Sequence, residues 1–327
     1  MMENRRRMRL YFAAASAACG VLFVLSLAVG RFSIEWSELF SDSMSARVFF
    51  SLRLPRTCMV LLAGVGLSVT GSVYQAVFQN PLASPDIIGV SSGASAGAAA
   101  AILLFGGGTL VTALAAFFGG FAAVLAALAL AAVSRRQGVL GIVLSGIAVN
   151  ALAQAVLMLM KMTADPEKQL ASIEFWIMGS FADVTADKFL GVFPWVLLGI
   201  AGLFLLHRQI LLLSLEEEEA RMLGVPVRWM RRIVLLLATL VTGAIVSVTG
   251  LISFIGLIAP HIARLLTRSS RFSTTVLAGL CGGGLLLLAD CLARSISASE
   301  VPVSIITSLL GAPFLFYLMC RKGDLHG

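Results

Sequence analysis

Residues 87–134 read IIGVSSGASAGAAAAILLFGGGTLVTALAAFFGGFAAVLAALALAAVS, a stretch with no charged side chain. A helix that crosses a bilayer needs about 20 apolar residues, so this stretch is long enough for two. Gly106-Gly107-Gly108 lies near its middle and predicts the turn between them. Asp86 precedes the stretch and is predicted to cap the first helix. The small residues of 89–97 recur at three- and four-residue spacing, which predicts a face for close helix packing.

The rest of the chain has the same character. Over 327 residues it is 59% hydrophobic and 13% charged, with a mean hydropathy of +0.97, far from the balance of a soluble protein. We therefore expect an all-α, polytopic membrane bundle of about ten spans in a single domain, residues 1–327. The other predicted spans lie in 10–30, 57–85, 137–160, 189–206, 233–260, 251–266, 272–289 and 301–320.

Charge predicts the orientation of these spans. An even number of spans puts both termini on one side, and most of the 24 Lys and Arg residues fall in segments on that side, including Arg5–Arg7 and Arg228–Arg232. The positive-inside rule then predicts cytoplasmic termini in a bacterial cytoplasmic membrane. Topology accounts for the net charge of +7, so we expect lipid and no nucleic acid as a partner. The apolar run after Arg9 is longer than the core of a signal peptide, which favours a retained first span.

A short sequence pattern occurs twice. Ser68-Val69-Thr70-Gly71 is followed ten residues after the glycine by Pro81, and Ser247-Val248-Thr249-Gly250 is followed in the same way by Pro260. The copies fall in the predicted second and seventh spans, which cross the membrane in opposite directions. This is typical of the inverted repeats of transport proteins. The half-repeats would cover roughly 57–160 and 232–320.

Residues 214–226, SLEEEEARMLGVP, form the one long charged segment with helix signals. Ser214 can cap a helix with Glu217 at its third position, and Gly224 supplies a stop. The predicted helix, Leu215–Leu223, is too short to be stable in water alone. We interpret it as a docking helix for a cytoplasmic partner. The alternative is an ordinary solvated loop helix.

Charged residues also lie at the mouths of predicted spans on the outer side. Arg53 and Arg56 flank a Leu-Pro pair on the side where the charge rule disfavours them. They either snorkel to lipid headgroups or capture acidic groups of a partner or ligand. Asp290 precedes Arg294 by four residues, which predicts an ion pair within one helix.

Polar or helix-breaking residues within the spans are candidates for a translocation pathway or for helix packing: Gln75, Asn80, Asn150, Gln154, Pro260 and His261. Asn150 and Gln154 share one helix face. His261 has no carboxylate or cysteine at ligand spacing, so a structural role is favoured over a metal site or a catalytic base. The five cysteines are scattered, which favours small buried hydrophobes over disulfides or metal ligands. We expect no metal and no cofactor.

Eight stretches, in this order, resemble the FecCD-type permease family, the membrane subunits of bacterial ABC importers for iron-siderophores, heme and vitamin B12. They are Arg53-Leu-Pro-Arg56, Gly71 with Gln75 and Asn80-Pro81-Leu82-Ala83, Gly89 to Gly93, Trp176 to Ser180, Ala220 with Leu223-Gly224, Phe254 to Arg264, Asp290 to Arg294, and Pro302 with Gly311-Ala312-Pro313. The first span and residues 161–174 carry no diagnostic match.

The resemblance implies a ten-span permease that pairs with a second permease subunit, identical or different, around a central pathway. It also implies two cytoplasmic ATPase subunits and an extracytoplasmic substrate-binding protein. By this match 214–226 is the coupling helix, and its contact residues would be Leu215, Glu219, Ala220, Leu223 and Gly224. The residues that receive acidic side chains of the binding protein would be Arg53, Arg56 and Arg294.

An iron(III)-siderophore complex is the expected cargo, with heme and vitamin B12 as alternatives. The chain lacks the G-x-x-x-x-G-K-[ST] nucleotide motif, so we expect a transport subunit that is not itself an enzyme. An ion-coupled secondary transporter is the alternative from a different class. It predicts carboxylates within the membrane, and Asp290, beside Arg294, is the clear candidate.

Overall fold

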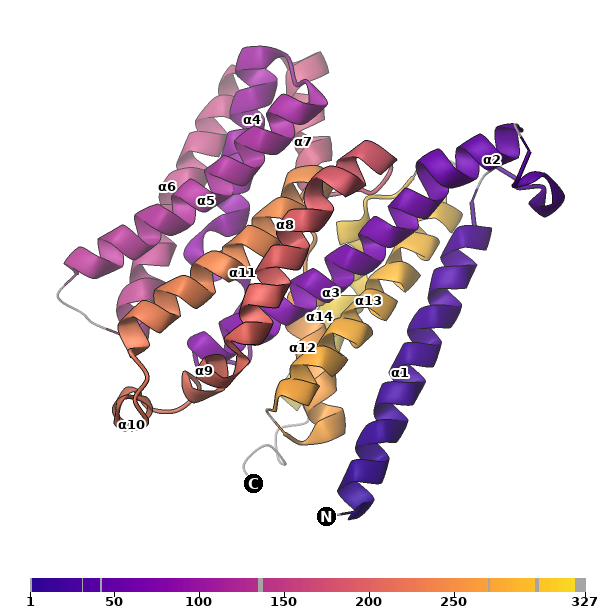
Figure 1. Cartoon of the computed structure of the whole chain (residues 1–327). Helices are drawn as coiled ribbons and strands as arrows, with labels where there is room; N and C mark the ends of the chain where they lie inside the picture. The colour runs from indigo at the N-terminus through magenta and orange to yellow at the C-terminus, as the bar shows by residue number, and fades with distance from the viewer. Residues whose placement is uncertain are drawn as a thin grey trace.

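The structure is a computed structural model that describes residues 2–30, 32–41, 43–134, 138–269, 271–297 and 300–320. Every regular element in these ranges is helical (Figure 1). The α-helices are α1 (Met2–Ala28), α2 (Met44–Val48), α3 (Leu54–Val77), α4 (Val90–Phe105), α5 (Thr109–Val133), α6 (Val139–Thr163), α7 (Ala171–Met178), α8 (Ala186–Leu205), α9 (His207–Leu212), α10 (Glu217–Met222), α11 (Val227–Thr249), α12 (Ile255–Thr267), α13 (Phe272–Ser295) and α14 (Val303–Cys320). Four short turns of helix join them: η1 (Trp36–Glu38), η2 (Phe49–Arg53), η3 (Pro85–Ile88) and η4 (Pro166–Leu170).

Ten of these helices correspond to the predicted spans. In the described residues, 7 helices are long and apolar enough to cross a membrane: α1, α3 with α2 and η2, α5, α6, α8, α11 and α13. The other three, α4, α12 and α14, are shorter apolar helices. The predicted turn is confirmed, since α4 ends at Phe105 and α5 begins at Thr109. The all-helical polytopic fold is therefore confirmed.

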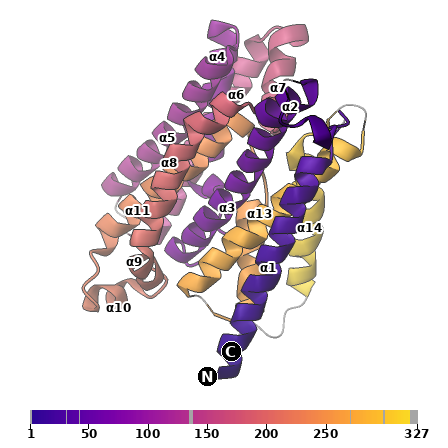
Figure 2. The ribbon, with the colours of Figure 1, turned by 45° about the vertical axis from the view of Figure 1, so that its right-hand side comes forward.

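The start of α1, the end of α14 and the short helix α10 lie at one end of the bundle, which we call the α10 end (Figures 1 and 2). The helix α2, the α4–α5 turn and α7 lie at the opposite end, the α2 end. Figure 2 shows α1 alongside α13, against which it packs at the edge of the bundle.

Two helices form the centre of the bundle. The apolar window of α3 is 72% buried and that of α11 is 67% buried, against 11% for α1 and 22% for α6 and α8. The helix α3 packs against α12 and α13, whereas α11 packs against α4 and α5. They run in opposite directions, because α3 starts at the α2 end and α11 at the α10 end (Figure 1). Each predicted half-repeat thus lends its first helix to the other half, an arrangement that favours the inverted repeat. The half-repeat boundaries stay a prediction.

The packing of α4 on α5 depends on small residues. A Cβ atom on Gly93 would overlap the carbonyl of Gly119, and one on Gly119 would overlap the carbonyl of Gly93. The two backbones therefore touch, as the small-residue pattern of 89–97 predicts. The predicted cap of α4 is wrong. Its N-cap is Gly89, at φ +83 and without a side-chain hydrogen bond, because Asp86 belongs to the separate turn η3.

Candidate functional site

The helices α4 and α12 do not reach across a membrane on their own. They have 16 and 13 residues, which at 1.5 Å rise per residue span about 24 Å and 20 Å of the roughly 30 Å hydrocarbon core. Segments 78–89 and 250–254, non-helical apart from η3, complete the crossings, and Gln79, Gly89, Gly250 and Phe254 within them have positive φ angles. Irregular backbone at membrane depth is tolerated where it lines a cavity or is covered by protein.

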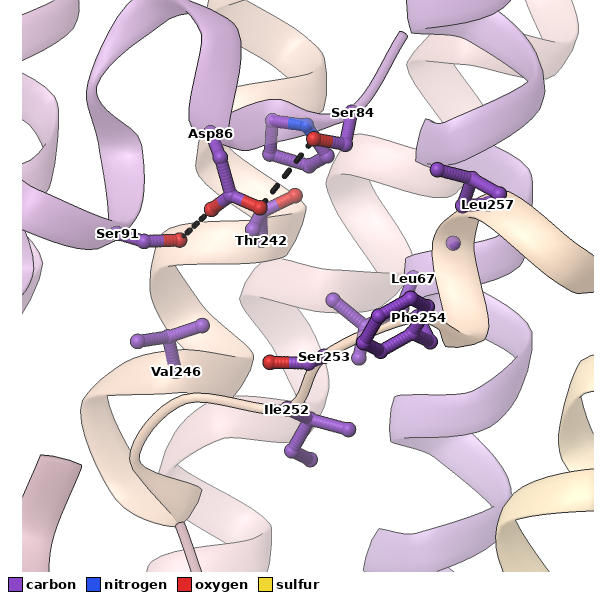
Figure 3. Close-up of a pocket in the computed structure, with 12 residues that line it drawn as sticks. Leu67, Ser84, Asp86, Ser91, Thr242, Val246, Ile252, Ser253, Phe254 and Leu257 are labelled. Carbon is purple, nitrogen blue, oxygen red and sulfur yellow. Dashed lines mark hydrogen bonds between the residues drawn. The ribbon is translucent and has the colours of Figure 1, made fainter. Parts of the chain in front are cut away.

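A cavity of about 250 Å³ lies where these two segments meet (Figure 3). Its lining comes from α3, η3, α4, α11 and the start of α12, and its polar side chains are Ser84, Asp86, Ser91, Thr242 and Ser253. The carboxylate of Asp86 is exposed and accepts hydrogen bonds from the hydroxyls of Ser84, at 3.2 Å, and Ser91. The opposite wall is apolar and includes Leu67, Val246, Ile252 and Phe254. This cavity can hold a polar group that is neutral or positively charged.

Three of the sequence candidates, Gln75, Pro260 and His261, lie on helices beside this cavity and do not line it. Gln75 is 5% exposed, and its Nε2 donates to the carbonyl of Leu257, a lining residue, at 3.4 Å. Its Oε1 is buried and has no hydrogen-bond partner among the residues that the structure describes. His261 is 9% exposed, its two ring nitrogens have no hydrogen-bond partner in the described residues, and its ring meets Phe314 edge to face. Pro260 is buried inside α12. Gln75 therefore joins α3 to α12, and His261 joins α12 to α14.

The remaining candidates lie farther from it. Asn80 is exposed, and its Oδ1 accepts from the backbone N–H of Leu82 at 2.9 Å, which shapes the turn after α3. The backbone of Asn150 lies against Gly89, and Gln154 is exposed on α6. The prediction missed Asp86, Ser91 and Ser253 as lining residues. The serine- and glycine-rich sequence around the starts of α4 and α12 was the available signal. It predicts close packing and a break in the helix, but it does not predict which side chains line a cavity.

A second cluster of charges lies at the α2 end. Arg56 donates from Nη2 to Asp290 Oδ1 at 2.8 Å and from Nη1 to Glu300 Oε2 at 2.9 Å. Arg294 Nη2 lies 3.0 Å from Asp290 Oδ2 and donates to Ser26 Oγ at 2.8 Å. The predicted Asp290–Arg294 pair is therefore confirmed. The network joins α1, α3, α13 and the link to α14.

Arg53 has a different set of partners. Its guanidinium donates to the carbonyls of Leu27, Ala28 and Phe32 at 3.1, 3.3 and 2.7 Å, so it caps the orphan carbonyls at the end of α1. Arg53, Arg56 and Arg294 are only 7%, 8% and 8% exposed. The structure brings the three together but ties them to acceptors of the same chain. Capture of a partner's acidic residues stays a prediction, and it would require these arginines to exchange partners.

The third feature is α10. Its helix covers Glu217–Met222, shorter than predicted, and Ser214 does not cap it: the N-cap is Glu216, without a side-chain hydrogen bond. The reason is that Ser214 and Leu215 continue the turns that end α9, through bonds to the carbonyls of Leu211 and Leu212.

The predicted stop of α10 is confirmed. Gly224 has φ +82, and the N–H groups of Gly224 and Val225 donate to the carbonyls of Arg221 and Ala220. This termination buries Ala220 and Val225 in the protein's own core. It leaves Met222 81% and Leu223 61% exposed.

One glutamate fastens α10 to the bundle. Glu217 pairs with Arg221 and lies 3.5 Å from Nη1 of the buried Arg231 of α11. Glu216, Glu218 and Glu219 are exposed. Of the predicted coupling residues, Leu215, Glu219, Leu223 and Gly224 are therefore exposed, and Ala220 is internal. The helix presents a small apolar surface, Met222 with Leu223, inside a charged border.

Comparison with known proteins gives concordant matches. The model of the FecCD transport family matches residues 18–321. An iron chelatin transport system permease protein of Helicobacter pylori is 37% identical over 320 residues, 93% of this chain and 96% of that protein. The molybdate import system permease protein MolB of Haemophilus influenzae is 35% identical over 314 residues, 92% and 93% of the two chains. A solved structure of a metal-chelate type ABC transporter in an inward-facing conformation is 34% identical with a TM-score of 0.86, covering 96% of this chain and 99% of that one.

Proposed function

Since this chain belongs to the FecCD transport family, we propose that it forms the membrane pathway of an importer for iron(III)-siderophore complexes, powered by separate ATPase subunits. It is an ABC importer permease of the FecCD type. The family assignment excludes the ion-coupled secondary transporter as the working model. The finer points below concern the ATPase, the second permease, the binding protein and the cargo.

The ATPase docks at the α10 end, which is then the cytoplasmic end. The observation that carries this is the exposure of Met222 and Leu223 on a helix fixed at both ends of its short length, by Glu217 and by Gly224. A rigidly held apolar surface with a charged border is suited to bind in a groove of a partner protein. One ATPase per permease gives two in the assembly, and the termini lie on the same side.

A second permease subunit covers α6. Only 22% of the apolar window of α6 is buried within this chain. The helix nevertheless carries two polar side chains, the exposed Gln154 and the half-buried Asn150. Polar side chains facing lipid are costly, whereas the same groups can face a partner helix or a water-filled path. The pathway thus lies between two permeases, identical or not, with α6 along it. The binding protein docks at the α2 end.

The cargo is assigned from the cavity and the relatives together. The exposed carboxylate of Asp86 disfavours a small oxyanion such as molybdate, the cargo named for one relative, and tolerates a neutral or cationic chelate. The Helicobacter relative is named for an iron chelate. Heme and vitamin B12 remain the alternatives because both are large chelates of the same general kind.

The test is transport by the reconstituted assembly of permease, ATPase and binding protein in proteoliposomes. ATP-dependent uptake of an uncharged iron(III)-hydroxamate, above that of hemin, cobalamin and molybdate, supports the proposal. Preference for hemin, cobalamin or molybdate overturns the cargo. Uptake driven by an ion gradient without ATP overturns the importer class.

A further inference from the structure

A large cleft opens on the side of the bundle, separate from the cavity at Asp86. It has a volume of about 1400 Å³ and lies between α5 and α8, with α7 at one side and the end of α11 as its floor. Both α5 and α8 are long enough to cross a membrane, and their side chains at the cleft are mostly apolar and exposed, including Leu110, Leu114, Phe118 and Trp195. When α5 and α8 span a membrane, the apolar wall of the cleft therefore faces the hydrocarbon region.

The wall of the cleft contains an unpartnered polar group. Thr112 of α5 lines it and is 5% exposed, and its buried Oγ1 has no hydrogen-bond partner in the described part of the chain. Because Oγ1 is itself buried, a molecule in the cleft would meet the rest of this side chain and not its hydroxyl.

The lining of the cleft also carries charges of both signs, all from η4, the start of α8 and the residues just before α8. These are Lys168, Lys188, Glu167, Asp183 and Asp187. No ion pair within the described residues neutralises them; Lys188 Nζ donates only to the backbone carbonyl of Asp183, at 2.8 Å. Two cations and three carboxylates beside an apolar cleft match a headgroup that carries both a phosphate and an ammonium.

We propose that the cleft binds one phosphatidylethanolamine molecule from the leaflet at the α2 end. Its acyl chains lie between α5 and α8 on the aromatic wall. The phosphate meets Lys168 and Lys188, and the ammonium meets the carboxylates. This assignment does not depend on the proposed cargo or on the ATPase.

The first test is lipid retention, measured by native mass spectrometry after extraction from nanodiscs of phosphatidylethanolamine and phosphatidylglycerol. Gly191 of α8 lines the cleft, and a Cβ there would meet nothing within 4 Å, so Gly191→Phe fills the cleft. Gly20 of α1, away from the cleft, has the same open surroundings, so Gly20→Phe is the matched control. We expect wild type and Gly20→Phe to retain phosphatidylethanolamine and Gly191→Phe to retain at least fivefold less. Equal retention by Gly191→Phe would overturn the proposal.

Two finer variants keep the proposal testable if Gly191→Phe does not fold. Lys188→Gln should lower retention of both lipids, because the phosphate loses one of its two cations; unchanged retention would overturn the phosphate contact. Asp187→Asn should lower retention of phosphatidylethanolamine but not of phosphatidylglycerol. Equal retention of the two lipids by wild type would overturn the headgroup assignment. Exclusion of lipid from the cleft on assembly with the second permease would show that protein covers it.

Discussion

Asp290 is the residue on which the α2-end network depends. Its side chain is fully buried and lies against the guanidinium groups of both Arg56 and Arg294. A buried pair of opposite charges is weak evidence for net stability, because desolvation offsets the attraction, but removing one partner leaves an uncompensated buried charge. One carboxylate thus makes two arginines tolerable inside the bundle, and through them it ties α1 and α3 to α13.

Asp290→Asn should destabilise the protein by about 3–5 kcal/mol, since Arg56 keeps only Glu300 and Arg294 loses its acidic partner. Thermal unfolding in detergent, followed by fluorescence-detected size exclusion, measures the change. Glu218→Gln, at an exposed glutamate, is the control and should have little effect. In Asp290→Asn with Arg294→Gln the loss should be smaller than the sum of the two single losses. Additive effects would show that the network is not coupled.

Gly71 is the repeated glycine of the first half, and it lies where α3 touches α12. A Cβ there would overlap the backbone carbonyl of Gly256, which cannot rotate away as a side chain could. Gly71→Ala should therefore destabilise the protein by about 1–3 kcal/mol or more by separating the two helices. Gly243→Ala is the matched control in α11, where the new Cβ would lie 3.5 Å from the nearest atom of Phe117. It should be neutral or slightly stabilising, as alanine favours helix. Equal thermal midpoints would contradict the close approach.

At the scale of elements, α10 shows what sequence can and cannot predict. The stop at Gly224 is local, since a left-handed residue after an amphipathic run is encoded within a few positions, and it was predicted correctly. The start was wrong, because whether Ser214 caps α10 or ends α9 depends on how the preceding helix approaches. The predicted cap of α4 failed for a similar reason, because Asp86 lies within the separate turn η3 and not at the start of α4.

Partners far apart in sequence were the other limit. Charge spacing predicted the Asp290–Arg294 pair, four residues apart, but could not reveal that Arg56 reaches Asp290 from another helix or that Arg53 caps α1. The apolar spans, in contrast, follow from composition and length alone, because lipid requires helices of that length. The cavity at Asp86 arises only when two interrupted helices meet, so no single stretch contains its signal.

Leu223→Asp should weaken ATPase binding about ten- to a hundredfold, the loss expected for a leucine buried at a small interface. Because Leu223 is exposed in this chain, the thermal midpoint of the Leu223→Asp variant should equal that of the wild-type permease. Ala220→Asp is the opposite case: Ala220 is 1% exposed, so a charge there should unfold α10 and lower the midpoint. Glu218→Gln should cost little, since border charges act mainly on the association rate. Copurification of the ATPase, with substrate-stimulated hydrolysis, measures coupling. Full coupling in Leu223→Asp would place the ATPase elsewhere.

At the scale of the molecule, the packing of each first helix against the other half favours the prediction of a single domain built from two half-repeats. The helix α3 packs against α12 and α13, and α11 packs against α4, α5 and α8, so the first helix of each predicted half lies against the other half. The short helix α4 follows α3 in the chain, and the short helix α12 follows α11. The segments that link each pair meet at the cavity. A movement of either half would therefore change the cavity directly.

This architecture predicts which end of the bundle meets the cytoplasm. In a variant whose five cysteines are replaced, a cysteine at the exposed Glu167, in η4 at the α2 end, should react with a membrane-impermeant thiol reagent in intact cells. A cysteine at the exposed Arg271, at the start of α13 at the α10 end, should not react until the membrane is permeabilised. Labelling of both after permeabilisation is the control, because it shows that each thiol is accessible. The reverse pattern in intact cells would show the opposite orientation, with the α10 surface outside. That result would exclude α10 as the docking site of a cytoplasmic ATPase.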